Sequence, residues 1–274
     1  MAEAVGEVIV AAVQMTSGSD VARNLSTAAD SIARATARGA ALVVLPENFA
    51  FMGRDDAERA AVAEAPGDGP IQRWAAAAAR DAGAWIVAGT VPVRARAGKF
   101  YSTCLVFDAS GEQRARYDKI HLFDVSIPGR TEHYQESAKT LAGCETVVTD
   151  SPLGGLGLAV CYDLRFPEQF RRMLSDGMRA LALPAAFTAA TGAAHWNLLV
   201  RARAVENLCP VIAAAQGGRH ESGRVTWGHS MIVDAWGTVL AECGNKPDIA
   251  VATLNGADLD RLRTAFPAVS HRRL

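Results

Sequence analysis

The sequence has few of the features that define metal-binding or disulfide-bonded proteins. Its five cysteines are an odd number without C-x-x-C spacing, so neither a disulfide framework nor a zinc ribbon follows. No histidines are spaced H-x-x-x-H or H-x-H, so no metal site is indicated. We therefore expect no metal and no cofactor, and free thiols suit the reducing cytoplasm. Lysine is scarce as well, because the only lysines are Lys99, Lys119, Lys139 and Lys246.

The chain also lacks charge of one sign, a basic leader and a long apolar run. Its 28 Lys and Arg nearly balance 29 Asp and Glu, so electrostatics give no reason to expect nucleic acid or an anionic membrane as partner. The start, "MAEAVGEVIVAAVQ", has no basic segment and does not resemble a signal peptide. The longest uncharged run, 180–200, contains Pro184, His195 and Asn197, which makes a poor membrane span. A small molecule is the expected partner.

The sequence alternates short apolar runs with amphipathic stretches. With 274 residues, half of them hydrophobic, we expect a single domain over 1–274, with a core at about 8–265 and a tail at 266–274. The pattern predicts strands and helices that alternate, with hairpins added. Strands are expected at 7–14, 41–47, 85–91 and 178–184, helices at 24–40, 69–84, 167–177 and 194–207, and a hairpin at 101–119. This arrangement is typical of an α/β fold with mixed sheets covered by helices.

Three apolar strands end in chemically unusual residues, namely Glu47, Cys161 and Pro184. Ligands of α/β sheets gather outside the carboxyl ends of strands, where Glu47 and Cys161 could meet. A lone cysteine at a strand end packs rather than reacts in roughly two cases out of three. Cys161 stands out because the polar residues of "CYDLR" follow it directly. It is therefore a candidate nucleophile.

A nucleophilic thiol needs activation, because the pKa of an unperturbed cysteine is about 8.5. One option is a Cys–His dyad, for which His121, His133, His195, His220 and His229 are available without any local signature.

The other option pairs Cys161 with Glu47 and Lys119. Lys119 sits in the apolar stretch "RYDKIHLFD" of a chain that otherwise prefers arginine. Glu136, in "HYQESAKT", is a further carboxylate. Each of these charges could equally be a solvated surface group, so the residues alone leave both options open.

Five motifs in order give a resemblance over nearly the whole chain. The motifs are "LVVLPENF", "YDKIHLFDVSIPGR", "YQES", "GLAVCYDLRFPE" and "GAAHWNLLVRARAVEN". Together they resemble the nitrilase superfamily of carbon–nitrogen hydrolases. The resemblance implies a four-layer α-β-β-α sandwich whose helices commonly pair in a dimer. It also implies a catalytic set of Glu47, Lys119 and Cys161, with Glu136 as a second glutamate and no cofactor.

The implied chemistry is a thiol amidase. Glu47 would take the proton of Cys161 as general base, and the thiolate would attack an amide carbonyl. Lys119 and the backbone N–H of Tyr162 would hold the oxyanion. Glu47 would protonate the leaving group and then activate the water that clears the thioester. Glu136 would orient Lys119.

Within the superfamily, the chain looks closest to the Nit branch, with its amidases for deaminated glutathione and for 2-oxoglutaramate. The stretches "GHSMIVDAWGTVL" and "FPAVSHRR" favour the former, whose products would be 2-oxoglutarate and Cys-Gly if the glutaryl amide is cleaved. Asp118 and Ala193 depart from the branch pattern but lie outside the catalytic set. The alternatives are an omega-amidase that releases ammonia, an N-carbamoyl hydrolase, and a non-catalytic interaction protein.

A carboxylate-bearing substrate would need a cationic partner near the thiol. Arg165, four residues after Cys161, is the first candidate. Arg201 and Arg203 are weaker ones. Tyr162 and Trp196 are expected to shape the pocket.

Overall fold

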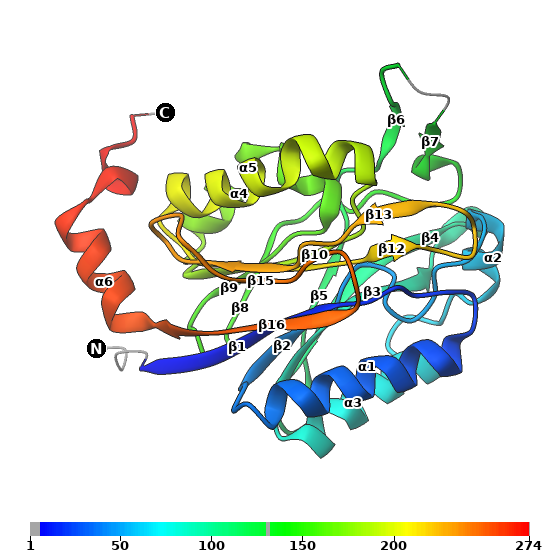
Figure 1. Ribbon diagram of the computed structural model, residues 1–274, viewed down its shortest axis with the longest axis horizontal. Coiled ribbons are helices and arrows are strands. Elements are labelled where there is room, and N and C mark those ends of the chain that lie inside the picture. The colour runs from blue at the N-terminus through cyan, green and yellow to red at the C-terminus, as the bar shows by residue number, and fades with distance from the viewer. Residues whose placement is uncertain (1–5, 130–131, 274) are drawn as a thin grey trace.

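Two six-stranded sheets form the centre of the molecule, as Figure 1 shows for the computed structural model, which describes residues 6–129 and 132–273. The first sheet comprises β1 (Glu7–Gln14), β2 (Leu42–Val44), β3 (Trp85–Arg94), β4 (Phe100–Phe107), β5 (Gln113–Asp118) and β16 (Asp248–Asn255). The second comprises β8 (Val147–Thr149), β9 (Leu156–Leu158), β10 (Ala180–Ala185), β11 (Val211–Ala215), β14 (Met231–Val233) and β15 (Val239–Glu242). The strand orders are β16-β1-β2-β3-β4-β5 and β15-β14-β11-β10-β9-β8.

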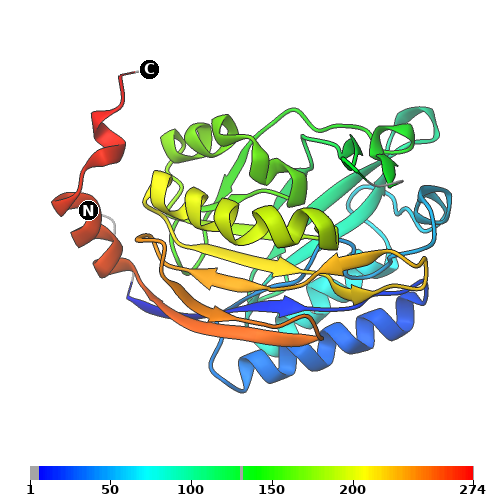
Figure 2. The same cartoon turned by 45° about the horizontal axis from the view of Figure 1, so that its top comes forward.

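Helices cover the outer face of each sheet. On the first sheet lie α1 (Val21–Thr36) and α3 (Pro70–Ala82), and on the second lie α4 (Pro167–Ser175) and α5 (Ala189–Asn207). Figure 2 shows the two sheets stacked between these helical layers. The predicted α-β-β-α sandwich is therefore confirmed.

The side chains of β1 explain why its sequence is apolar without a break from Val8 to Val13. Val10 and Ala12 belong to the core between the two sheets, whereas Ala11 and Val13 belong to the core under α1 and α3. Successive residues of a strand point to opposite faces, and both faces of this strand are covered. The middle of a central strand in a four-layer sandwich is therefore hydrophobic on both faces.

Both sheets direct the carboxyl ends of parallel strands toward the same end of the molecule. In the first sheet β1, β2 and β3 are parallel, and in the second β9, β10 and β11 are parallel. At that end also lie α2 (Asp56–Ala61) and two hairpins, β6 (Asp124–Ser126) with β7 (His133–Gln135) and β12 (Gly217–Arg219) with β13 (Val225–Trp227). This end is where the chemistry is expected.

Two helices begin earlier than the sequence pattern predicted, because capping residues set their starts. The Asp20 side chain accepts a hydrogen bond from the Arg23 N–H, so α1 begins at Val21. Thr188 caps α5, which extends through Gly192. A Cβ at Gly192 would lie 2.2 Å from a side-chain carbon of Trp227, so glycine permits this close packing.

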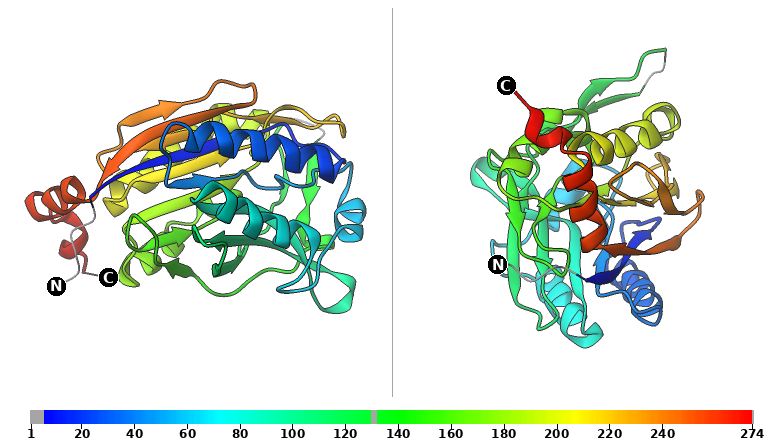
Figure 3. Two further views of the ribbon diagram at one scale, coloured as in Figure 1. Left: turned by 90° about the horizontal axis from the view of Figure 1, so that it is seen from below. Right: turned by 90° about the vertical axis from the view of Figure 1, so that its left-hand side faces the viewer.

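The C-terminal part lies at the other end of the sandwich. Helix α6 (Gly256–Ala265) and the short 3-10 helix η4 (Ala268–His271) lie beyond the ends of the strands in the left view of Figure 3. Arg263 of α6 donates hydrogen bonds to the carbonyls of Leu208 and Met178, which tie this helix to the second half of the sandwich. The expected tail 266–274 thus contains a helical turn, and residue 274 lies outside the described residues.

Candidate active site

Cys161 sits at a sharp turn directly after a buried strand. It begins the 3-10 turn η3 (Cys161–Arg165) with φ +49°, a left-handed value that is uncommon outside glycine. The Asp163 carboxylate accepts a 2.8 Å hydrogen bond from the Val160 N–H, which braces the turn. The thiol lies beside the Glu47 carboxylate and the backbone N–H of Ala186, and both groups act on its pKa. With 7% of its surface exposed, Cys161 can be reached only from the pocket.

Glu47 reaches Cys161 from the end of the other sheet. It follows β2 and precedes Asn48, whose φ of +59° turns the chain away from the strand. The adjacent strand approaches closely here, because a Cβ at Gly89 would lie 1.9 Å from the Pro46 carbonyl oxygen. Gln216 Nε2 donates a 3.1 Å hydrogen bond to the Glu47 carbonyl. Segments of both sheets therefore fix the backbone that carries this carboxylate.

Lys119 lies between two carboxylates at the end of β5. Its Nζ is 2.9 Å from Glu47 Oε1 and 2.9 Å from Glu136 Oε2, and only 2% of its side chain is exposed. Glu136 begins the 3-10 turn η2 (Glu136–Ala138) and also accepts a 2.8 Å hydrogen bond from the Phe123 N–H. The ammonium is thus held on two sides, as expected for a group that must not move during a reaction.

Burial and charge set the protonation of this group. Burial alone would raise the pKa of Glu47, but the Lys119 ammonium and hydrogen bonds from Lys119 and Cys161 bring the net pKa below its ordinary value. Burial would lower the pKa of Lys119, but the charges of Glu136 and Glu47 raise it. Burial and the Glu47 charge raise the pKa of the Cys161 thiol. The resting site is therefore a neutral thiol beside a carboxylate and an ammonium.

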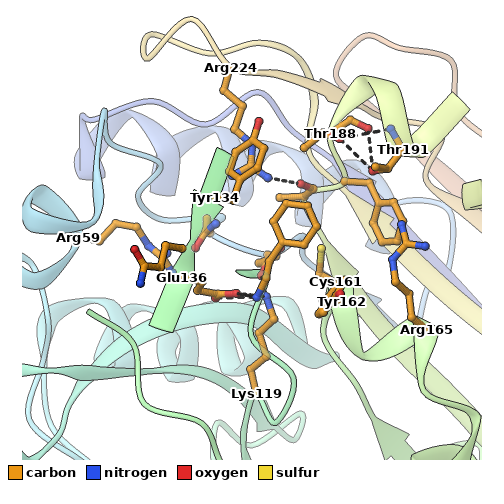
Figure 4. A pocket seen from close by; sticks show the side chains of 16 residues that line it. Arg59, Lys119, Tyr134, Glu136, Cys161, Tyr162, Arg165, Thr188, Thr191 and Arg224 are labelled. Atoms are coloured by element: carbon orange, nitrogen blue, oxygen red, sulfur yellow. Dashed lines mark hydrogen bonds and ion pairs between the residues drawn. The ribbon is translucent and has the colours of Figure 1, made fainter. Parts of the chain in front are cut away.

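These three residues lie in a pocket with roughly 590 Å³ of space, open solvent included (Figure 4). Arginines and aromatic side chains make up much of the remaining lining. The lining residues are Glu47, Asn48, Arg59, Lys119, Phe123, Tyr134, Gln135, Glu136, Cys161, Tyr162, Arg165, Ala186, Phe187, Thr188, Thr191 and Arg224. Of the residues named from sequence, the structure brings Glu47, Lys119, Glu136, Cys161, Tyr162 and Arg165 together.

Tyr162 and Arg165 form one wall of the pocket. The Tyr162 ring packs edge-on against Phe123 and Phe166, with ring centroids 5.2 and 5.4 Å apart. The Arg165 guanidinium lies 5.7 Å from the ring centre of Tyr162. It donates to His195 Nδ1 at 3.3 Å.

Trp196 does not line the pocket, contrary to expectation. It is fully buried, its Nε1 donates a 2.7 Å hydrogen bond to the His229 carbonyl, and its ring packs on Phe187 at 5.0 Å. Trp196 therefore supports a lining residue from behind. The sequence did not show which face of α5 lines the pocket, where Thr191 lies instead.

Arg201 and Arg203 also lie away from the pocket. Arg201 donates to the Gly237 carbonyl at 2.8 Å, and Arg203 donates to the Leu164 carbonyl at 2.9 Å. Both arginines hold α5 against neighbouring segments. They are structural residues rather than substrate partners.

The Cys–His alternative has no support in the described residues, because no histidine among them lines the pocket. His121 instead contacts Asp163 and His229 contacts Glu242. The same part of the chain holds no group of three or more His, Cys, Asp or Glu side chains arranged for a metal ion. None of its helices is long and apolar enough to cross a membrane.

Sequence reasoning missed several pocket residues, namely Arg59, Phe123, Tyr134, Phe187, Thr188, Thr191 and Arg224. They come from α2, the segment that leads into β6, strand β7, the loop after β10, the first turn of α5 and the loop between β12 and β13, where no periodic pattern marks them. Tyr134 and Arg224 stand on separate hairpins, yet the Arg224 guanidinium lies 5.2 Å from the Tyr134 ring centre. Only the fold reveals that these segments share a site.

Comparison with known proteins decides the family. Residues 9–264 match the carbon–nitrogen hydrolase family. The chain belongs to this family. It is thereby a hydrolase of carbon–nitrogen bonds, as the sequence resemblance implied. Deaminated glutathione amidase from a Synechocystis strain is 44% identical over 272 residues, which cover 96% of this chain and 97% of that protein.

Solved structures agree with this assignment. The C. elegans NitFhit protein superposes with a TM-score of 0.90 at 39% identity, covering 98% of this chain and 66% of that chain. A mutant amidase from Nesterenkonia sp. AN1, 29% identical with a TM-score of 0.82, covers 98% of this chain and 95% of its own. In that mutant the active-site cysteine carries an acetamide moiety from fluoroacetamide.

Proposed function

We propose that this chain is a thiol amidase that hydrolyses deaminated glutathione, the amide between 2-oxoglutarate and Cys-Gly. The observation that carries the proposal is the buried set of Cys161, Glu47 and Lys119 at a pocket lined by arginines. Burying three ionisable groups together is costly unless they pair, and these three pair with one another. The relatives named as deaminated glutathione amidases support the substrate.

The first half-reaction forms a thioester. The Cys161 thiol lies beside Glu47, which accepts its proton as sulfur attacks the amide carbonyl. The raised pKa of the thiol means that this proton leaves during attack and not beforehand. Lys119 and the Tyr162 N–H stabilise the oxyanion. Glu47 then gives the proton to the amide nitrogen, the C–N bond breaks, and Cys-Gly leaves as a neutral amine.

The second half-reaction reverses these proton transfers. Water enters where the amine stood, Glu47 takes one of its protons, and the hydroxide oxygen attacks the thioester carbonyl. Lys119 again balances the oxyanion. The C–S bond breaks, the proton on Glu47 returns to sulfur, and 2-oxoglutarate is released. Glu136 keeps Lys119 charged and in position throughout, since it holds Nζ at 2.9 Å.

Two product assays test the proposal. Deaminated glutathione should give 2-oxoglutarate and Cys-Gly in equal amounts, measured by liquid chromatography with mass detection. 2-Oxoglutaramate should release ammonia more slowly, at equal substrate concentration. A preference for 2-oxoglutaramate would make the chain an omega-amidase, and a preference for an N-carbamoyl amide would make it a carbamoyl hydrolase. No turnover of any of them would favour the non-catalytic reading.

We propose further that the chain acts as a cytoplasmic homodimer, without nucleic acid or membrane as partner. Five free cysteines suit a reducing compartment. A net charge of -1 gives no electrostatic attraction to nucleic acid or to an anionic membrane. Several large apolar side chains are exposed on α5 and the second sheet, including Leu198, Val205, Trp236 and Leu240. Light scattering coupled to gel filtration should give twice the monomer mass of 28.9 kDa.

A further inference from the structure

We propose that Arg165 and Arg224 bind two different acidic groups, one on each side of the scissile amide. The inference rests on the proposed amidase function and adds the residues that select the substrate. Figure 4 shows the two side chains reaching the pocket from different walls. Arg165 comes from the η3 turn after Cys161, and Arg224 comes from the loop between β12 and β13.

Neither guanidinium forms an ion pair with a carboxylate within residues 6–129 and 132–273. The contacts of Arg165 are the His195 ring nitrogen and the faces of Tyr162 and Phe187. The aromatic rings hold this charge on both sides without neutralising it. Its fork of N–H donors is therefore only partly used.

The Arg224 guanidinium also contacts an aromatic ring and uses only part of its hydrogen-bond donors. Its Nη2 donates a 2.7 Å hydrogen bond to the Ala186 carbonyl, and its guanidinium lies over the Tyr134 ring. Its Nε is buried without a hydrogen-bond partner in the described part of the chain. A buried donor left unpaired costs free energy, which a bound acidic ligand would recover.

The charges of the lining leave room for two anions. Its carboxylates, Glu47 and Glu136, are both engaged by Lys119. The remaining charged side chains of the lining are all arginines. Of these arginines, Arg165 and Arg224 bring positive charge to two walls of the pocket without an ion pair to a carboxylate of the described residues. One carboxylate cannot satisfy two guanidiniums that approach from different walls, so two separated acidic groups fit better.

The substrate class is then an amide with an acid on the acyl part and another on the leaving amine. Deaminated glutathione has this pattern, whereas 2-oxoglutaramate has an acid on the acyl part alone. The arginine that binds the acid of the leaving amine would therefore make the enzyme prefer deaminated glutathione over 2-oxoglutaramate. A site built for a charged group rejects analogues that lack it, because its own charge then stays unpaired.

Three matched substrates separate the two contacts. The first is deaminated glutathione, with both acids. The second is its C-terminal carboxamide, which lacks the acid of the leaving group. The third is 4-oxopentanoyl-Cys-Gly, in which a methyl group replaces the acid of the acyl part. Wild type, Arg165→Gln and Arg224→Gln are compared by kcat/KM on all three. Arg219→Gln, an exposed arginine of the same hairpin as Arg224, is the control.

For wild type and Arg219→Gln we expect each trimmed substrate to lose about tenfold to a hundredfold in kcat/KM. One arginine variant should no longer distinguish deaminated glutathione from the carboxamide. The other should no longer distinguish it from the 4-oxopentanoyl compound. The inference is overturned if both folded variants lose the same preference between substrates. It is also overturned if either folded variant keeps both preferences. Within this set of substrates, the proposed function itself fails if wild type hydrolyses none of the three, which is a result distinct from any pattern among the variants.

Discussion

The Tyr117 hydroxyl donates a 2.6 Å hydrogen bond to the fully buried carboxylate of Asp163. Tyr117 lies two residues before Lys119, and Asp163 lies two residues after Cys161. The same carboxylate accepts hydrogen bonds from the His121 N–H at 3.0 Å and from the Val160 N–H at 2.8 Å. Asp163 therefore ties the segment that carries the ammonium to the turn that carries the thiol.

Asp163→Asn should destabilise the protein and weaken catalysis together. An amide has one acceptor oxygen in place of two and turns its own N–H donors toward donors of the protein. We expect the free energy of unfolding to fall by about 2–3 kcal/mol, measured by urea denaturation. The exposed Asp150→Asn should change it by less than about 0.5 kcal/mol. Equal effects of the two variants would remove Asp163 from this role.

Lys119→Arg should lose activity although it keeps the charge. The guanidinium is planar and bulkier than an ammonium, and it cannot fit between two carboxylates that each lie 2.9 Å from Nζ. Loss of an oxyanion donor lowers kcat by about a hundredfold to a thousandfold. Lys139→Arg, at an exposed site, is the matched control. Near-normal kcat in the Lys119 variant would rule out the oxyanion role.

The two glutamates should differ in importance. Glu47→Gln removes the carboxylate that pairs with Lys119 and lies beside Cys161, so turnover should stop. Glu136→Gln keeps the acceptor for the Phe123 N–H and leaves Lys119 paired with Glu47. We expect a smaller loss, of about tenfold to a hundredfold in kcat. Steady-state rates of the two variants decide the order, and a more damaged Glu136 variant would reverse the assignment.

The pH dependence should follow the direction of the pKa shifts. Glu47 must be ionised, and its pKa is lowered, so activity is present above that pKa and is lost only as pH falls below the ordinary value of 4.5. Cys161 must start as a thiol, and its pKa is raised from 9.0. Alkylation of Cys161 by iodoacetamide should therefore still accelerate with pH above 9.0. A plateau near neutral pH would show a preformed thiolate instead.

The sequence predicted the layers and the reactive group because these depend on local patterns. Apolar runs marked β1, β2 and β10, and the motifs around Glu47, Lys119 and Cys161 stand at strand ends. Arg224 could not be found in this way. It lies in a polar loop, and its place in the pocket depends on the packing of the β12–β13 hairpin beside Tyr134.

Trp196 was predicted to line the pocket and does not, whereas Arg224 lines the pocket and was not predicted. Its place in "GAAHWNLLV" suggested that Trp196 is a pocket residue, but its ring is fully buried. Spacing along a helix gives relative faces only. Which face meets the pocket depends on the sheet beneath it, where Trp196 finds the His229 carbonyl.

The most direct test of the mechanism is the mass of the protein during turnover. Wild type mixed with deaminated glutathione and quenched in acid should carry a 2-oxoglutaryl group, and digestion should place it on the peptide that contains Cys161. Cys161→Ala should form no adduct and no product while remaining folded, and the exposed Cys144→Ala should behave like wild type. An acyl group on another residue, or turnover by folded Cys161→Ala, would contradict the account.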